Sequence, residues 1–122
     1  TTASGRERLM SKVTIYHNPR CTKSRQTLAL LNEHGIEPTV IEYLNDSPDE
    51  STIRSLLKKL GMSATELIRR KEHKALELPD TSDESELITR MAANPQIIER
   101  PIVVKGAKSR LGRPPEQVLE IL

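Results

Sequence analysis

A strand, a helix and a second strand follow one another near the start of the chain, and this order constrains the fold more than any other feature. Residues 13–16 (VTIY) are β-branched or aromatic and run into the breaker-rich segment 17–19 (HNP), which predicts a strand that enters a loop. Apolar residues then recur at helical spacing over 22–34, and Gly35 supplies a stop. Residues 38–44 predict a second strand. The order is that of a βαβ unit and indicates an α/β fold.

The next segment predicts a long amphipathic helix. Ser47 is expected to be its N-cap, with Pro48 as the first helical residue and Glu50 placed for a capping box. Apolar residues follow at the spacing of one helix face: Ile53, Leu56, Leu57 and Leu60. Gly61 is expected to end the helix.

Further helices are expected in the middle of the chain. Ser63 and Glu66 repeat the capping-box spacing and predict a short helix that runs to about Arg70. Another helix is expected over residues 83–93, halted by the Asn-Pro pair that follows. Residues 74–81 have no strong period and are expected to form a loop.

The end of the chain returns to β structure. Residues 100–104 predict a strand that begins with a proline, and residues 105–108 a turn, after which 109–112 could pair back as a hairpin. A closing helix is expected over 114–122. Three of its residues are expected to face inward: Val118, Leu119 and Leu122.

The whole order is therefore β-α-β, a helical insertion, then β-β-α around a mixed sheet. Residues 13–122 contain no repeat, low-complexity tract or linker, so one domain is predicted. Residues 1–12 show no periodicity and are expected to form a flexible N-terminal extension.

Charge and composition exclude several classes of function. The 19 Lys and Arg residues nearly balance the 17 Asp and Glu residues, and a net charge of +2 does not point to nucleic acid or an anionic membrane. Tyr16 and Tyr43 are the only aromatic residues, so a surface that stacks bases would lack its rings. No apolar run approaches the roughly 20 residues of a membrane span.

The cysteine and histidine content limits the possible sites as well. Cys21 is the only cysteine, so an intrachain disulfide is impossible, and a reducing, cytoplasmic location fits best. We expect no metal site and no tightly bound cofactor. The three histidines are scattered without metal-ligand spacing: His17, His34 and His73.

Cys21 is the strongest candidate for chemistry, because it lies where the first strand turns into a helix. The unpaired N–H groups and partial positive charge of a helix N-terminus favour a thiolate over a thiol. Four neighbours in sequence add positive or polar character: His17, Arg20, Lys23 and Arg25. The alternative is that Cys21 is a small buried hydrophobic residue, the most common role of a free cysteine.

The same geometry suggests an anion site. Backbone N–H groups after a strand-to-helix turn can hold an oxyanion, but a nearby thiolate repels it, so further positive charge is expected from elsewhere. The candidates are Arg69 or Arg70, Arg100 and Arg113. Each of them could instead be a solvated surface residue. Arg100 and Arg113 both precede prolines in loops, where functional groups concentrate.

Three segments of this chain together resemble the glutaredoxin-coupled arsenate reductase family. They are residues 15–25 (IYHNPRCTKSR), 99–104 (ERPIVV) and 111–114 (LGRP). The similarity extends over about residues 13–122. It implies a thioredoxin-like fold with a helical insertion and an enzyme that reduces arsenate to arsenite.

The resemblance also implies a role for each matching residue. Cys21 would attack arsenate to form a covalent adduct, glutathione would attack this adduct, and glutaredoxin would remove the glutathione as a mixed disulfide. His17 would lower the pKa of the cysteine, and Ser24 would place a hydroxyl near the thiol. Three arginines would hold the oxyanion: Arg69, Arg100 and Arg113.

A single cysteine narrows the mechanism and leaves two alternatives. The chain cannot resolve an adduct by an internal disulfide, so the second thiol must come from outside, which excludes reductases with a relay of three cysteines. One alternative is a glutathione-dependent thiol oxidoreductase with a different substrate. The other is a non-catalytic regulator like Spx, although Ser24 stands where such regulators carry the second cysteine of a CxxC motif.

Overall fold

The computed structural model describes residues 13–122, which form two compact units. The sheet unit contains residues 13–42 together with Arg100–Leu122, and the helical unit contains Tyr43–Glu99. The extension expected at residues 1–12 lies outside the described residues.

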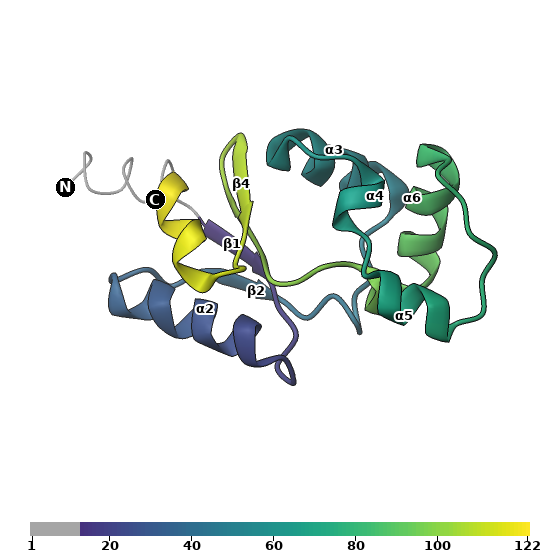
Figure 1. Cartoon of the computed structure of the whole chain (residues 1–122). Coiled ribbons are helices and arrows are strands. Elements are labelled where there is room, and N and C mark those ends of the chain that lie inside the picture. Colours follow the sequence, from purple (N-terminus) through teal and green to yellow (C-terminus); the bar gives the residue numbers. More distant parts are fainter. Residues whose placement is uncertain (1–12) are drawn as a thin grey trace. The chain divides into compact units, whose positions relative to one another are not determined.

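The sheet unit is built on a mixed four-stranded sheet (Figure 1). Its strands are β1 (Val13–Tyr16), β2 (Thr39–Ile41), β3 (Ile102–Lys105) and β4 (Lys108–Leu111), in the spatial order β2-β1-β3-β4. β1 pairs with β2 in parallel, and β3 pairs antiparallel with both β1 and β4. The predicted βαβ unit and the C-terminal hairpin are therefore both confirmed, although β2 is shorter than the segment 38–44 that the sequence suggested.

The strand register brings three distant segments to one end of this sheet. Tyr16 at the end of β1 lies opposite Ile102 at the start of β3, and Ile102 lies opposite Leu111 at the end of β4. The residues after Tyr16, before Ile102 and after Leu111 consequently leave the sheet together.

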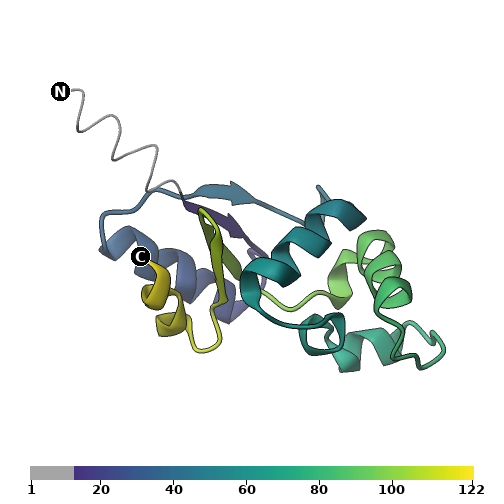
Figure 2. The same cartoon turned by 90° about the horizontal axis from the view of Figure 1, so that it is seen from above.

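One face of the sheet is covered by α2 (Thr22–Glu33) and by a 3₁₀ helix, η2 (Pro115–Ile121). Figure 2 shows these two helices, blue and yellow, side by side on the same face. They bury a core cluster of aliphatic residues: Val13, Ile15, Leu31, Val103, Val118 and Ile121. With Phe and Trp absent, β-branched residues and leucine fill this layer.

The closing helix differs from expectation in type. It is a 3₁₀ helix, with three residues per turn, so its buried residues repeat at every third position: Pro115, Val118 and Ile121. The prediction for Val118 is confirmed. Leu119 and Leu122, expected inward from an α-helical period, are only half-buried.

The helical unit consists of four α-helices and one 3₁₀ turn. They are α3 (Glu50–Leu60), α4 (Ala64–Leu67), α5 (Arg70–Ala75), α6 (Glu84–Ala93) and η1 (Pro95–Ile97). α3 packs on α6, and the apolar face predicted for α3 is buried as expected. Gly61 ends α3 in the left-handed conformation, with φ of 69°.

Two details of the helical prediction are wrong. The N-cap of α3 is Asp49, whose carboxylate accepts from the backbone N–H of Thr52 at 2.8 Å, while the Ser47 hydroxyl donates to the carbonyl of Ala92. The Ser47 hydroxyl is thus engaged elsewhere, and the negative charge of Asp49 favours the positive helix end, so the helix begins after Asp49.

The short helix expected to reach Arg70 ends at Leu67 instead. Ile68 is extended and forms a β-bridge with Ile98, and the N–H of Arg69 donates to the carbonyl of Ile97 at 2.7 Å. A new helix, α5, then begins at Arg70 and was missed. None of the helices formed by residues 13–122 combines the length and apolar character that a bilayer crossing requires.

Candidate active site

The loop between β1 and α2 is held by hydrogen bonds of its own. Ser24, one turn into α2, is fully buried, and its Oγ lies 2.5 Å from Nδ1 of His17 and accepts from the N–H of Asn18 at 3.0 Å. The carbonyl of Asn18 accepts from the N–H of Cys21, and its side-chain oxygen accepts from the N–H of Arg20. These bonds tie both ends of the loop together and place Cys21 at the N-cap of α2.

The half-buried Cys21 thiol lies in surroundings that favour its ionised form. Burial alone raises its pKa. The backbone N–H groups of Ser24 and Lys23, together with the Arg100 guanidinium, outweigh burial, so the net pKa of Cys21 is lowered. The backbone N–H groups at the start of α2 and one distant arginine therefore both favour the thiolate predicted for Cys21.

Arg113 approaches the same sulfur from the end of β4. Its Nη2 lies 3.7 Å from Sγ of Cys21, and its Nε donates to the carbonyl of Arg100 at 2.7 Å. The peptide bonds Arg100–Pro101 and Arg113–Pro114 are both cis. The sheet unit thus brings together Cys21, His17, Ser24, Arg100 and Arg113, as the register of β1, β3 and β4 requires.

His17 is buried, and burial is the main reason that its pKa is lowered from the ordinary value. Glu42 opposes this shift, and Arg25 adds to it. An imidazole with a lowered pKa is neutral at pH 7, so it gives the thiolate no charge. Its contact with the thiol region runs through Ser24. His17 is accordingly a positioning residue in this geometry, and its influence on Cys21 stays a prediction.

Arg69 belongs to the helical unit, where two carboxylates engage its guanidinium. Nη1 donates to Glu99 at 2.9 Å, and Nε lies 3.0 Å from Glu72. These pairs raise the pKa of Arg69, with Glu72 as the larger cause. Arg70 is exposed at the first position of α5. A role of Arg69 in oxyanion binding stays a prediction.

Sequence reasoning missed Gly112 as a site residue. A Cβ at this position would lie 2.3 Å from Oγ1 of Thr27 and 2.7 Å from Cγ of Pro101, so only glycine lets the segment before Arg113 pass this close to α2. Its N–H also donates to the carbonyl of Pro101 at 3.0 Å. The only signal in the sequence was the glycine itself, directly before a candidate arginine.

No metal centre accompanies these residues in the described part of the chain. Within residues 13–122, no group of three or more His, Cys, Asp or Glu side chains could hold a metal ion. The chemistry of this site is that of a thiolate beside two guanidinium groups. Such a site can hold an oxyanion against a nucleophile.

Comparison with known proteins decides the family. The sequence pattern of the ArsC family matches residues 16–121. The chain belongs to the ArsC family. This confirms the resemblance inferred from the sequence, and the matched segment contains every site residue described above.

Individual ArsC relatives are similar to this chain over nearly its whole length. An arsenate reductase of Haemophilus influenzae is 44% identical over 114 residues, covering 90% of this chain and 98% of that protein. A protein of Escherichia coli K12 named "Uncharacterized protein YfgD" is 57% identical over 118 residues, covering 93% and 99%. The solved structure of an arsenate reductase from Vibrio cholerae superposes with a TM-score of 0.87 at 48% identity, covering 92% and 98%. The predicted thioredoxin-like α/β fold is confirmed.

Proposed function

We propose that this ArsC protein reduces arsenate to arsenite, using Cys21 as the nucleophile and outside thiols as the reductant. The observation that carries the proposal is the placement of Arg100 and Arg113 at a thiol whose pKa is lowered. Relatives called arsenate reductase, at 40–45% identity, support the same substrate. Arsenate is an oxyanion that two guanidinium groups can bind through its oxygens.

The first step is an attack by the Cys21 thiolate on arsenic. An S–As bond forms, and one arsenate oxygen leaves as water after taking up protons from solvent. Arg100 and Arg113 hold the remaining oxygens and offset the repulsion between the thiolate and the anion. The N–H groups at the start of α2 stabilise the thiolate until the bond forms.

The second step needs a thiol that this chain does not contain. Glutathione attacks the arsenic of the adduct, a second As–S bond forms and a second oxygen leaves as water. A glutaredoxin thiol then attacks the glutathione sulfur, so a mixed disulfide leaves and the electron pair of the broken bond stays on arsenic as As(III). In the overall balance two thiols are oxidised to one disulfide, and arsenic takes up the two electrons as As(V) becomes As(III). Water then cleaves the S–As(III) bond and releases arsenite, so Cys21 returns to its thiolate and acts as a catalyst, not as the net reductant.

The test is arsenate-dependent NADPH consumption with glutathione, glutaredoxin and glutathione reductase supplied. Wild type is compared with Cys21→Ser and with Arg110→Ala, whose guanidinium pairs with Glu120 on the surface. We expect turnover that Cys21→Ser abolishes and Arg110→Ala leaves unchanged. Equal turnover by wild type and Cys21→Ser would refute the proposed nucleophile.

A second candidate is a glutathione-dependent thiol enzyme with a different substrate. It is favoured by one observation: the Escherichia coli protein at 57% identity is named "Uncharacterized protein YfgD", whereas the Haemophilus influenzae arsenate reductase is 44% identical. This candidate would be favoured if the wild-type protein showed no arsenate turnover while its Cys21 still reacted with iodoacetamide.

A further inference from the structure

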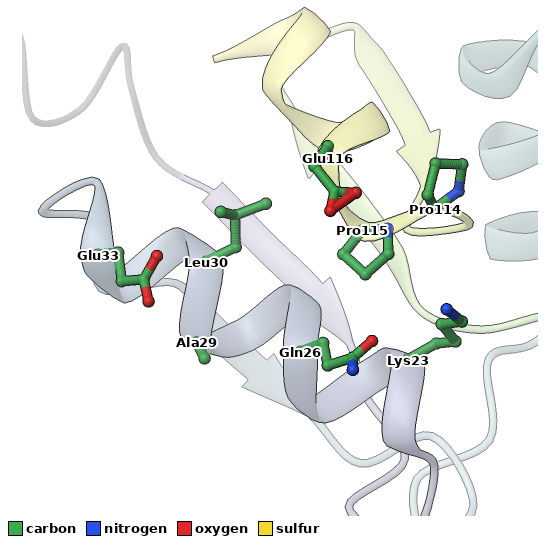
Figure 3. Close-up of a pocket in the computed structure, with 8 residues that line it drawn as sticks. All are labelled: Lys23, Gln26, Ala29, Leu30, Glu33, Pro114, Pro115 and Glu116. Atoms are coloured by element: carbon green, nitrogen blue, oxygen red, sulfur yellow. The ribbon is translucent and has the colours of Figure 1, made fainter.

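A groove of about 490 Å³ lies between α2 and the beginning of η2 in the sheet unit. The residues that define it include Lys23, Gln26, Leu30, Glu33, Pro114 and Glu116. Figure 3 shows Lys23 and Pro114 at one end, Glu33 at the other, and Glu116 between them on η2. Its volume is within the range of about 300–1,000 Å³ that is usual for small-ligand sites.

This groove borders the thiol site at two points. Lys23 lines it, and the backbone N–H of the same residue helps to lower the pKa of Cys21. Pro114 also lines it and directly follows Arg113, whose Nη2 lies 3.7 Å from Sγ. This end of the groove is therefore formed by one residue whose backbone acts on the sulfur and by another that directly follows an arginine at the sulfur.

The charges along the groove are arranged for a zwitterion. Lys23 supplies an ammonium at the thiol end, and Glu116 supplies a carboxylate further along, above an apolar surface made by Leu30 and the prolines. In the described part of the chain, no hydrogen bond or ion pair engages the side chains of Lys23 or Glu116. Both groups are thus available to a ligand.

The length of the groove sets the size of that ligand. α2 rises about 1.5 Å per residue, so Lys23 and Glu33 are about 15 Å apart along its axis. An extended tripeptide spans at most about 10 Å. A ligand of that size anchored at Lys23 would reach the level of Leu30 and Glu116 but would stop short of Glu33.

We propose that this groove binds the reducing thiol as a small zwitterionic peptide, with a carboxylate on Lys23 and an ammonium on Glu116, so that its thiol reaches Cys21. The inference rests on the proposed function, because it locates the outside thiol that the single cysteine requires. Glutathione is the probe of this chemistry, since it is a tripeptide thiol with both kinds of charged group. We expect the groove to bind glutathione more tightly than thiols that carry no charge.

The test measures thiol exchange at Cys21 and uses no arsenate. Cys21 is first converted to a mixed disulfide with 5-thio-2-nitrobenzoate. An added thiolate then attacks Cys21 Sγ, a new disulfide forms, and coloured thionitrobenzoate leaves as the thiolate. Rates are measured against the concentration of glutathione and, separately, of 2-mercaptoethanol, which has no charged groups.

The informative variants change Glu116, with Glu33 as the matched control in the same groove. We expect Glu116→Gln to raise the half-saturating glutathione concentration about threefold and Glu116→Lys about tenfold, as the loss and reversal of one exposed charge contact imply. Glu33→Gln removes the same charge and should change nothing. The rates with 2-mercaptoethanol should be equal in all four proteins.

Three results would overturn the proposal. One is that glutathione exchange does not saturate or does not respond to Glu116. Another is that Glu33→Gln has the same effect as Glu116→Gln, which would indicate general charge attraction only. The third is that Glu116→Lys raises only the glutaredoxin concentration needed for turnover, which would make the groove a protein-docking surface. A missing arsenate activity with normal glutathione exchange would refute the proposed substrate but not this groove.

Discussion

Replacing Gly112 by alanine tests whether close packing between α2 and the segment before Arg113 builds the site. The new Cβ would lie 2.3 Å from Oγ1 of Thr27 and 2.7 Å from Cγ of Pro101, well inside van der Waals contact. Thr27 cannot easily turn away, because it is buried in α2 and its hydroxyl donates to the carbonyl of Lys23 at 2.8 Å. The segment with Arg113 must therefore move away from Cys21.

The expected loss of stability follows from this overlap. Overpacking of a close-packed region destabilises by about 1–3 kcal/mol, and contact with two atoms places Gly112→Ala at about 2–3 kcal/mol. The unfolding entropy of about 2.1 cal/mol/K per residue gives this chain of 122 residues roughly 0.25 kcal/mol per degree. The melting temperature should accordingly fall by about 8–12 °C.

Thermal unfolding by circular dichroism measures the shift, and two variants serve as comparisons. Gly112→Ala combined with Thr27→Ala should recover part of the loss, because Oγ1 and Cγ2 of Thr27 are removed and Pro101 remains. Gly106→Ala, in the β3–β4 turn with φ of 62° and open space around it, should destabilise by about 1–2 kcal/mol but leave Cys21 alkylation unchanged. A Gly112→Ala protein with wild-type stability and wild-type Cys21 alkylation would refute the reasoning.

Three further predictions concern the thiol and its arginines. The rate of Cys21 alkylation by iodoacetamide should reach half its maximum at a pH below the ordinary thiol pKa. Arg100→Ala should move this pH midpoint upward. His17→Ala should move it less, because the imidazole is neutral. An unchanged midpoint in Arg100→Ala would contradict the assigned cause. Arg113→Ala should lower arsenate turnover about tenfold or more, with only the small fall in melting temperature that loss of its hydrogen bond to the Arg100 carbonyl implies. Arg110→Ala is the control, and a loss of the fold in Arg113→Ala would instead make Arg113 structural. Because ionisation is favoured in the folded state, stability should rise with pH from the folded pKa of Cys21 toward the ordinary value near 9.0, and this rise should be absent in Cys21→Ser.

Much of the fold was predictable because its signals are local. The β-branched run of β1, the apolar period of α3 and the glycine after it depend on residues a few positions apart. The errors occurred where local signals compete or are weak. Asp49 replaced Ser47 as the cap because both residues are capable of capping, and the short α5 carries too few residues for a period to show.

Local sequence alone establishes where the reactive group of this site lies. Cys21 precedes a helix after a proline loop, so the helix start that favours its thiolate is a property of local sequence. Because it is the only cysteine of this sequence, the proposed reduction needs a second thiol from outside. Both conclusions need no knowledge of distant contacts.

Which distant groups join Cys21 depends on tertiary contacts. Arg113 is 92 residues away along the chain, and its approach to Sγ depends on the pairing of Tyr16 with Ile102 and of Ile102 with Leu111. It depends equally on the missing side chain at Gly112. Strand register and side-chain packing are collective, long-range properties, so residues far apart in sequence reach one sulfur only once the whole sheet unit has formed.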